Sequence, residues 1–423
     1  MALVVQKYGG TSVGSVERIK AVAERVLRAW KAGHGLVVVV SAMAGETNRL
    51  LALGQAVTDR PEPRELDALA ATGEQVSAAL TAMALRSAGA PAVSLLGHQV
   101  RIQTDSAFTR ARIRGIDVAR IREAVAAKAV AVVAGFQGVD AQGNITTLGR
   151  GGSDTTAVAI AAALGADLCE IYTDVDGVYT ADPNLVPSAR KIARLTYEEM
   201  LELASLGAKV LQIRSVEVAM KYGVPVHVRS SFSDEDGTMI EPEGSGLEEV
   251  FVSGVTYDRD VAKVTVAGIS EAREIAALVF EPIAKANVSV DMIIQGATRE
   301  GTTDLTFTVS KADGAAAKEL AQKVAKKLGA QEVLFDRDVS KVSIVGLGMR
   351  SHAGIAARMF RILANEGIPI DAVSTSEIKV SCLIASRYVE LAVRSLHDGF
   401  GLGGEGNGAP PAAKKSVRKR VRR

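Results

Sequence analysis

A glycine-rich loop near the start of the chain has the residue types for binding a phosphate. The segment K-Y-G-G-T-S follows residues 3–6, which are typical of a buried strand, and precedes helical spacing from Val16 onwards. Gly9 and Gly10 let backbone N–H groups approach an anion, and the helix N-terminus and Lys7 add positive charge there. Further donors are the hydroxyl groups of Thr11 and Ser12. No G-x-x-x-x-G-K-[ST] motif occurs, which excludes a P-loop, and a plain glycine turn with a solvated lysine is the alternative.

A second loop, T-L-G-R-G-G-S-D, follows a predicted strand near residues 144–148. Gly151 and Gly152 expose amides at the start of an alanine-rich helix, and Arg150 offers a forked guanidinium group for a carboxylate or phosphate. Alternatively, Ser153 and Asp154 cap that helix, although capping does not explain Arg-Gly-Gly in front of them. Two such loops on one sheet predict a phosphoryl donor and a second anionic substrate that face each other.

A third segment, Y-T-D-V-D-G-V-Y-T-A-D-P, follows a predicted strand at residues 170–173. Its side chains could surround the base and ribose of a nucleotide, and its acidic residues do not have the spacing of an EF-hand. An ordered turn with side-chain-to-backbone hydrogen bonds is the alternative. The candidate nucleotide residues are Thr173, Asp174, Tyr179 and Asp182.

Apolar runs alternate with helical segments over the first 250 residues, and this order must position the loops. Such a pattern predicts an α/β fold with a mainly parallel sheet sandwiched by helices, whose ligands bind at the carboxyl ends of the strands. The predicted strands are residues 3–6, 36–40, 130–134, 170–173 and 226–228, and the predicted helices include residues 16–30 and 64–89.

The chain beyond residue 250 contains an internal repeat. Lys263 aligns with Lys341, and Asp291 aligns with Asp371. Each copy predicts a small ferredoxin-like βαββαβ unit, which beside a larger α/β domain indicates sensing or assembly. We therefore expect a catalytic domain at 1–250, two regulatory units at 251–338 and 339–402, and a disordered basic tail at 403–423.

Charge and composition limit the function classes. The formal net charge is +2, and removing the seven basic residues of the last ten leaves −5 for residues 1–413. The tail has no aromatic residues for stacking on bases, so a solvated tail is favoured over nucleic-acid binding.

Two cysteines exclude a disulfide framework, and no apolar run approaches the ~20 residues of a membrane span. A G-x-G-x-x-G pattern occurs at Gly401, Gly403 and Gly406, but no helix is predicted after it, so it is not a dinucleotide-binding motif. We expect a cytoplasmic protein without a secretory signal.

Seven motifs then occur in order and nearly without gaps: KYGGTSV, VVVVSAMAGETNRLL, ATGEQVS, VAGFQGVD, TTLGRGGSDTTAVA, YTDVDGVYTADP and EEMLELASLGAKVLQIRSVE. Over residues 1 to about 402 the chain resembles the aspartate kinases of the amino-acid kinase family, with that family's tandem ACT domains at the C-terminal end. This resemblance implies phosphorylation of the β-carboxylate of L-aspartate by ATP, whose phosphates carry Mg²⁺, with no metal held by the protein itself. The reaction would be the first step towards lysine, threonine, methionine and diaminopimelate.

The resemblance also implies site residues, with Lys7 and Asp154 as the catalytic pair. ATP would be bound by Lys7, Tyr8, Gly9, Gly10, Ser41, Thr173, Asp174, Tyr179, Asp182 and Lys209. Aspartate would be bound by Thr47, Glu74, Arg150, Gly151, Gly152, Ser153 and Asp154. The substrate carboxyl group has a pKa of about 3.9 and is already ionised, so no strong general base is needed. We expect Glu74 and Asp154 to anchor the substrate ammonium group, Arg150 to bind its α-carboxylate, and Lys7 to neutralise the phosphoryl group.

The repeats imply feedback control by lysine, threonine or both, and a homo-oligomer formed through the ACT units. The first repeat departs from the family pattern, because Gly296 replaces an expected Asn and the Pro-Gly turn before its helix is missing. A purely structural role in a dimer interface is the alternative. The expected effector residues are Asp291, Gln295, Met349, Ser351, His352, Ser374, Thr375 and Glu377.

Three other readings compete with an aspartate kinase. A related kinase could act on glutamate or acetylglutamate, although the tandem repeats and the loop from Arg150 to Asp154 oppose it. A non-catalytic amino-acid sensor could keep the kinase shape, but Lys7, Glu74, Arg150 and Asp154 are all retained. Nucleic-acid binding by the tail would be salt-sensitive and non-specific.

Overall fold

The computed structural model describes residues 2–207, 210–243, 252–270, 274–296, 301–349 and 354–404. It divides into two compact units, which we call the N-terminal unit (Met1–Tyr179 and Lys191–Gly246) and the C-terminal unit (Thr180–Arg190 and Leu247–Arg423). The predictions for Lys209, Ser351, His352 and the basic tail after residue 404 lie outside the described residues.

The N-terminal unit is built on an eight-stranded sheet in the order β10-β12-β11-β9-β1-β2-β6-β3. All neighbouring strands are parallel except β11 and β12. The central strands are continuous apolar runs, as expected for a sheet covered on both faces, and this confirms the predicted α/β class. The strands are β1 Leu3–Tyr8, β2 Gly35–Val40, β3 Ala92–Leu95, β6 Val130–Ala134, β9 Leu168–Thr173, β10 Arg194–Thr196, β11 Val226–Ser230 and β12 Thr238–Glu241.

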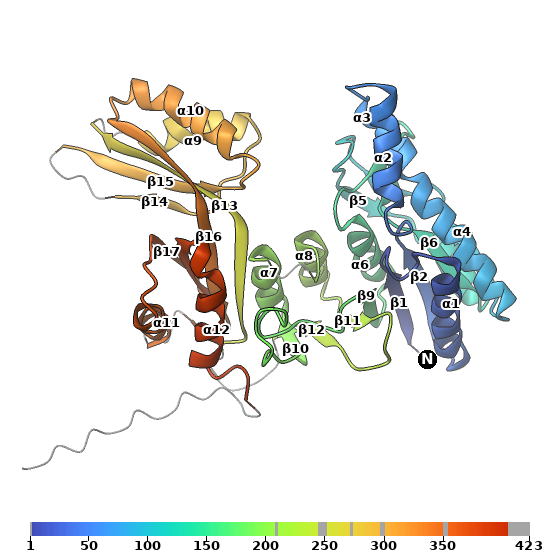
Figure 1. Cartoon of the computed structure of the whole chain (residues 1–423). Helices are drawn as coiled ribbons and strands as arrows, with labels where there is room; N and C mark the ends of the chain where they lie inside the picture. The colour runs from blue at the N-terminus through green and yellow to red at the C-terminus, as the bar shows by residue number, and fades with distance from the viewer. Residues whose placement is uncertain are drawn as a thin grey trace, which may run out of the picture. The chain divides into compact units, whose positions relative to one another are not determined.

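Helices cover both faces of this sheet, with α1 and α4 on one face and α6 on the other (Figure 1). Helix α1 begins after Ser15, whose hydroxyl accepts a hydrogen bond from the amide of Arg18, and buries Ile19, Val22 and Val26 along one stripe. The helices are α1 Val16–Lys31, α2 Glu46–Val57, α3 Pro63–Ala70, α4 Thr72–Ser87, α5 Ala119–Ala126, α6 Gly152–Leu164, α7 Tyr197–Ser205 and α8 Ile213–Tyr222.

The single helix predicted over residues 64–89 is wrong, because the chain forms α3 and α4 with a break at Ala71. The Gln137 side chain donates a buried hydrogen bond of 2.9 Å to the Ala71 carbonyl, and the Thr72 hydroxyl donates to the Leu69 carbonyl at 2.7 Å. A helix is interrupted where its carbonyl oxygens accept hydrogen bonds from side chains instead of from backbone amides. The break precedes Glu74, which therefore lies in the first turn of α4.

A second, four-stranded sheet in the order β5-β4-β7-β8 carries the strand before the second glycine loop. The prediction that both glycine loops follow strands of one sheet is therefore wrong. In the described part of the chain, strand β8 pairs with β7 of this small sheet, and Gly135 and Phe136 separate β7 from β6 of the main sheet. The strands are β4 Ile102–Thr104, β5 Ile113–Ile116, β7 Gln137–Val139 and β8 Ile145–Thr147.

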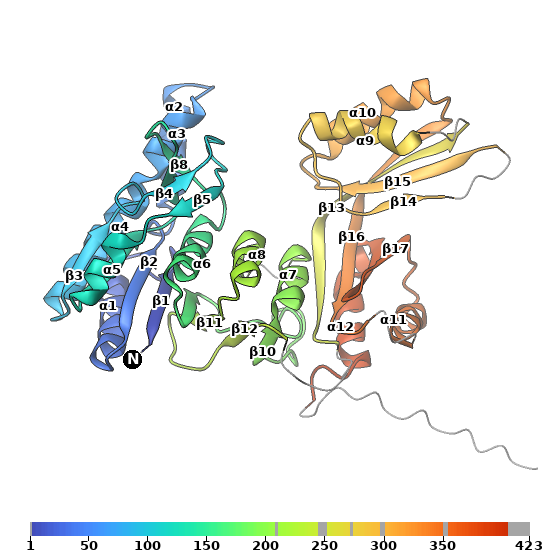
Figure 2. The ribbon, with the colours of Figure 1, turned by 180° about the vertical axis from the view of Figure 1, so that it is seen from behind.

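The C-terminal unit contains a six-stranded antiparallel sheet in the order β14-β15-β13-β16-β18-β17. Helices α9 and α10 pack at the end of the sheet with β14 and β15, and α11 and α12 at the end with β17 (Figure 2). The elements are β13 Gly254–Ile269, α9 Ile275–Lys285, β14 Ile293–Gln295, β15 Thr303–Val309, α10 Gly314–Lys327, β16 Glu332–Val345, α11 Gly354–Asn365, β17 Ala372–Thr375, β18 Lys379–Ala385 and α12 Val389–Gly399.

The long strands β13 and β16 each serve both repeats. Val264 of β13 lies in the hydrophobic core of the first repeat, whereas Val255 of the same strand lies in that of the second. The first repeat has the predicted βαββαβ order. In the second repeat the last strand comes from the start of β13 rather than from the chain after α12, which corrects the prediction for that copy. The domain boundaries stay a prediction, although β16 runs across residues 338/339.

The equivalent charged residues of the two repeats pair crosswise. The Lys263 ammonium lies 2.5 Å from a carboxylate oxygen of Asp371, and Lys341 forms an ion pair with Asp291. Each lysine of one repeat thus binds the aspartate of the other. A duplication whose copies are related by an approximate two-fold axis produces this exchange.

Residues 180–190 leave the N-terminal unit and pack into the core of the second repeat. Val186 is buried there, and the Val255 amide donates to the Thr180 carbonyl at 2.7 Å. The Arg190 side chain donates to the Leu402 carbonyl at 2.8 Å. The predicted nucleotide segment is therefore divided between the two units after Tyr179.

Among the residues that the structure describes, no helix is long and apolar enough to cross a membrane. Cys169 and Cys382 are buried free thiols. A cytoplasmic location stays a prediction.

Candidate active site

Lys7 and Asp154 form a buried ion pair that joins the two glycine loops. The Lys7 ammonium lies 2.6 Å from Asp154 Oδ1, and the two side chains are 10% and 11% exposed. Lys7 is near the carboxyl end of β1, and Asp154 is in the first turn of α6, which packs against β1. The loops therefore meet although their strands belong to different sheets, because the helix after the second loop returns to the main sheet.

The first glycine loop is held by backbone contacts. The Gly9 amide donates to the Tyr172 carbonyl at 3.1 Å, so it bonds within the protein. A Cβ atom at Gly10 would lie 2.8 Å from the Ala42 carbonyl oxygen, a distance that excludes any side chain there. Ser12 is buried, and its hydroxyl group hydrogen-bonds to that of Ser231 at 2.9 Å. These contacts shape the loop around Lys7.

Glu74 is a buried carboxyl group with one oxygen that has no hydrogen-bond partner among the described residues. Its Oε1 atom accepts from the Ala42 amide at 3.0 Å, and its Oε2 atom is buried without a partner. Burial raises the pKa of Glu74 to about 7, although the Ala42 hydrogen bond opposes the shift. An unpaired buried carboxyl oxygen is suited to a ligand that brings a positive charge.

The second glycine loop starts α6 without a side-chain cap. Gly151 is the N-cap residue at φ +67°, and Ser153 and Asp154 lie inside the first turn of α6, so the capping alternative for these two residues is wrong. A Cβ atom at Gly151 would overlap the Gln212 side chain. Ser153 is buried, whereas Arg150 is exposed at the rim of the loop. Gly152 is also buried, as the first residue of α6.

The remaining predicted substrate and phosphate residues, Tyr8, Ser41 and Thr47, lie at the carboxyl ends of β1 and β2 and at the start of α2. Ser41 follows β2, and its amide donates to the Tyr8 carbonyl at 3.1 Å. Thr47 is half-buried in the first turn of α2. Tyr8 itself is fully buried and stacks on Tyr172, with ring centroids 4.7 Å apart. The structure thus places the Tyr8 ring in the core, and only its backbone remains a candidate for binding ATP.

The third predicted segment is divided between the units. Thr173 ends β9, and its hydroxyl donates to Asp174 at 3.1 Å. The Tyr179 hydroxyl donates to Asp176 in the same unit. Asp182 belongs to the C-terminal unit, where its carboxylate accepts from the Tyr257 hydroxyl at 2.9 Å and from the Asn184 amide. Asp182 therefore makes the side-chain-to-backbone turn bond named as the alternative reading.

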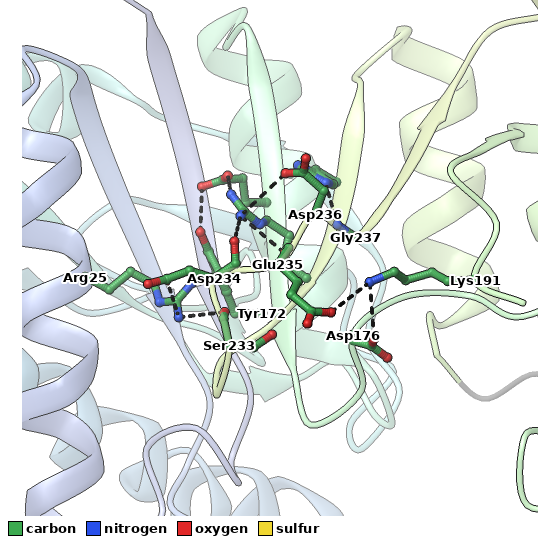
Figure 3. A network of polar contacts seen from close by, with 12 residues as sticks. Arg25, Tyr172, Asp176, Lys191, Ser233, Asp234, Glu235, Asp236 and Gly237 are labelled. Atoms are coloured by element: carbon green, nitrogen blue, oxygen red, sulfur yellow. Dashed lines mark hydrogen bonds and ion pairs between the residues drawn. The ribbon is translucent and has the colours of Figure 1, made fainter.

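The segment Ser231–Gly237, which we call the acidic loop, was not among the predicted site residues. It follows the carboxyl end of β11, and the Ser231 amide and hydroxyl group both donate to the Thr173 carbonyl, at 2.9 and 3.0 Å. Figure 3 shows the loop between Arg25 and Lys191. The sequence does contain a pattern that indicates this loop. S-F-S-D-E-D-G closely follows a predicted parallel strand, and ligand-binding loops are expected at that position.

A cavity of about 590 Å³ lies on the opposite face of the main sheet. Val4 and Gln6 of β1 line it, and residues with alternate numbers point to opposite faces of a strand, so Lys7 points away from it. Its lining includes Glu170, which accepts a buried hydrogen bond of 2.8 Å from Gln6. The cavity is therefore separate from the candidate active site.

The predicted effector residues fall at the two ends of the six-stranded sheet. Asp291 precedes β14 and Gln295 ends it, while Ser374 and Thr375 lie on β17 at the other end. Met349 is buried in the core of the second repeat, where it packs against apolar side chains. Glu377 follows β17.

Comparisons with known proteins show the family to which the chain belongs. The model of the amino acid kinase family matches residues 2–230, and an ACT domain model matches residues 342–400. An aspartokinase of Pseudomonas aeruginosa is 57% identical over 404 residues, which cover 95% of this chain and 98% of that protein. The structure of E. coli aspartokinase III in complex with aspartate and ADP is 27% identical, covers 94% of this chain and 99% of that one, and has a TM-score of 0.75. Its complex with lysine and aspartate, with the same identity and coverage, has a TM-score of 0.71. The chain belongs to the amino acid kinase family and, within it, to the aspartokinases.

Proposed function

We propose that this chain transfers the γ-phosphoryl group of ATP to the β-carboxylate of L-aspartate, and we assign roles in this reaction to individual residues of the two glycine loops and their surroundings. The observation that carries these roles is the buried Lys7–Asp154 ion pair at the meeting point of two glycine loops. The E. coli relative binds aspartate and ADP, which supports the choice of both substrates.

In the proposed reaction a β-carboxylate oxygen of aspartate attacks the γ-phosphorus, and the bond to the β,γ-bridging oxygen breaks to release ADP. No proton has to move, because the nucleophile is already ionised. The main barrier is the approach of two anions. Lys7 reduces it by placing its ammonium group beside the transferring phosphoryl group, and Asp154 holds that ammonium in position.

The substrate is oriented by groups of opposite charge. Glu74 Oε2, which is buried without a partner, accepts the substrate ammonium group, and the exposed Arg150 binds the α-carboxylate at the rim. Thr47, in the first turn of α2, and Ser153, in the second glycine loop, each add a hydroxyl group. Thr173, Asp174 and Tyr179 bind the nucleoside part of ATP, and Lys209 completes the proposed nucleotide set.

Mg²⁺ enters this proposal as the companion of the ATP phosphates, where it neutralises charge. Among the described residues, no group of three or more His, Cys, Asp or Glu side chains is arranged to hold a metal ion. In this proposal Mg²⁺ binds to the phosphates, and the protein residues named above bind the phosphates as well.

Lysine is the effector best supported by a relative, because E. coli aspartokinase III was solved with lysine bound. We extend the proposal to inhibition by lysine or threonine at the two ends of the six-stranded sheet, and to a homo-oligomer formed through the same repeats. The scaffold role of the repeats is the competing outcome.

An assay of aspartyl phosphate, trapped with hydroxylamine, tests the proposal. We expect product with aspartate and not with glutamate or acetylglutamate, and inhibition when lysine or threonine is added. ATP turnover that does not depend on aspartate would contradict the assignment. The mass of the protein in solution, with and without each effector, tests the oligomer.

A further inference from the structure

Tyr179 and Lys191 face each other at the point where the chain leaves and re-enters the N-terminal unit. The two residues form an antiparallel bridge, and the Ile192 amide donates to the Val178 carbonyl at 2.8 Å. Thr238 stabilises both sides of this bridge. Its hydroxyl group donates to the Ile192 carbonyl at 2.6 Å and accepts from the Val178 amide at 2.8 Å. The backbone around Tyr179 is therefore fixed on the side of Lys191.

The Asp176 carboxylate connects the side chains of these two residues. The Tyr179 hydroxyl lies 3.0 Å from each carboxylate oxygen, and the Lys191 ammonium lies 3.2 Å from Oδ2. Partial burial opposes ionisation of Asp176, but the Tyr179 hydrogen bond and Lys191 together lower its pKa. The carboxylate that accepts from Tyr179 is thus held by Lys191.

The stem of Lys191 packs directly against the turn that contains Asp176. A Cβ atom at Gly177, which has φ +154°, would lie 2.9 Å from Lys191 Cδ and 2.7 Å from Thr238 Oγ1. Only glycine allows this approach. The lysine stem and the turn therefore form one packed element.

The acidic loop holds Lys191 from its other side. Glu235 lies 3.5 Å from the Lys191 ammonium. The loop is fixed in turn to α1, because Arg25 donates to the Ser233 carbonyl at 2.9 Å and pairs with Asp234 at 3.0 Å (Figure 3). Lys191 is thus the centre of a chain of contacts from α1 to Tyr179.

We infer that Lys191 is a positioning residue for nucleotide binding, which acts through Asp176 to hold the Tyr179 side chain in the nucleotide site. This inference rests on the proposed function, which assigns Tyr179 to that site. Lys191 does not touch the substrate itself; its ammonium fixes the carboxylate that orients the tyrosine ring.

The test compares Lys191→Met, Lys191→Arg and the control Lys221→Met, an exposed lysine on α8. Direct titration with ADP measures nucleotide affinity, and the aspartyl phosphate assay measures the KM for each substrate. For Lys191→Met we expect the ADP dissociation constant and the KM for ATP to rise about tenfold, as for a misplaced binding group. We expect kcat and the KM for aspartate to change far less. Lys191→Arg restores most of the ADP affinity, and Lys221→Met leaves it at the wild-type value.

A double-variant cycle distinguishes positioning from direct contact. If Lys191 acts through Asp176, then Lys191→Met adds little to the loss already caused by Asp176→Asn. Additive losses would overturn the inference, as would an unchanged ADP affinity in Lys191→Met. Equal losses in Lys191→Met and Lys191→Arg, with lowered melting temperatures in both, would also overturn it. Failure of the proposed function looks different, because the wild-type protein would then form no aspartyl phosphate.

Discussion

Lysine–aspartate ion pairs occur in both units of the molecule, and they differ in burial. In the N-terminal unit Lys7 and Asp154 are both about nine-tenths buried. In the C-terminal unit the Lys341 side chain is 6% exposed, but that of its partner Asp291 is 52% exposed. A pair buried on both sides costs desolvation free energy that its attraction barely repays, so it is weak evidence for stabilisation. Its position at the meeting of two glycine loops instead fits the proposed role in phosphoryl transfer.

The pairs of the C-terminal unit instead connect two copies of one repeat. Lys263 with Asp371 is partly exposed on both sides, and water screens its attraction. These pairs join the two repeats, and we expect them to contribute modestly to stability. Five predictions test this comparison between buried groups assigned to chemistry in the N-terminal unit and contacts assigned to assembly in the C-terminal unit.

The largest effect is expected for Lys7→Ala. Loss of the ammonium group removes charge stabilisation from the transferring phosphoryl group, so turnover should fall at least about a hundredfold. The far-ultraviolet circular dichroism spectrum should remain that of a folded protein. Lys20→Ala, on the exposed side of α1, is the control. Turnover near the wild-type value would place the chemistry elsewhere.

A smaller effect follows from the titration of Glu74. Its pKa of about 7 leaves the group mostly protonated at pH 6, where it cannot pair with the substrate ammonium. The KM for aspartate should therefore rise about tenfold from pH 8 to pH 6. In Glu74→Gln the KM should be high and vary little over this range. A parallel pH profile in the variant would exclude Glu74 as the titrating group.

The raised pKa of Glu74 also predicts how the stability of the folded protein changes with pH. The direction is opposite to that expected for a salt-bridged carboxyl group, whose pKa is lowered by folding. The folded protein binds the Glu74 proton more tightly than the unfolded chain, whose pKa is near 4.5, so stability falls as pH rises from about 4.5 to 7. Glu74→Gln should thus resist urea better than the wild-type protein at pH 8. The advantage should disappear at pH 4.5.

A third effect concerns an uncharged buried contact in the C-terminal unit. The Thr180 hydroxyl accepts from the Arg190 amide at 2.9 Å and hydrogen-bonds to His397 Nε2 at 3.0 Å. His397 is fully buried, and burial lowers its pKa. Thr180→Val leaves these partners unsatisfied and should reduce the free energy of unfolding of this unit by about 1–3 kcal/mol in urea. Thr180→Ser keeps the hydroxyl group and should lose much less.

The smallest effects are expected for the crosswise ion pairs. Asp371→Asn should cost less than about 1 kcal/mol in the same urea experiment, because that pair is screened on both sides. Asp291→Asn should cost more than Asp371→Asn, because it leaves the Lys341 ammonium in a site that is only 6% exposed. The reverse order, or a cost above that of Thr180→Val, would show that these pairs are more than assembly contacts.

Local patterns predicted much of the N-terminal unit. The predicted strand at residues 130–134 coincides with β6, and the predicted helix start at Val16 is correct. The apolar run and the helical spacing are local properties, so they can be read without knowing the neighbours. The break at Ala71 was missed because the hydrogen bond that makes it comes from Gln137, which is distant in the sequence.

The candidate site was predicted in part for the same reason. Lys7, Gly10 and Asp154 carry residue-type signals, and the structure brings Lys7 and Asp154 into contact. Asp182 was grouped with Tyr179 because the two are close in the chain, but its carboxylate bonds to Tyr257 in the C-terminal unit. Lys191 gave no signal, because its role depends on a bridge to Tyr179 that closes after the excursion of residues 180–190.

The sequence by itself determined the fold class, the repeat and the two glycine loops, because periodicity, duplication and glycine content act over short stretches of chain. Tertiary structure alone decided that β8 joins a second sheet and that β13 and β16 serve both repeats. It also decided that Lys263 pairs with Asp371 and Lys341 with Asp291, rather than within each copy. Strand pairing and ion pairing of this kind depend on which distant segments share a core, and that choice is made by the burial of whole faces rather than by any single residue.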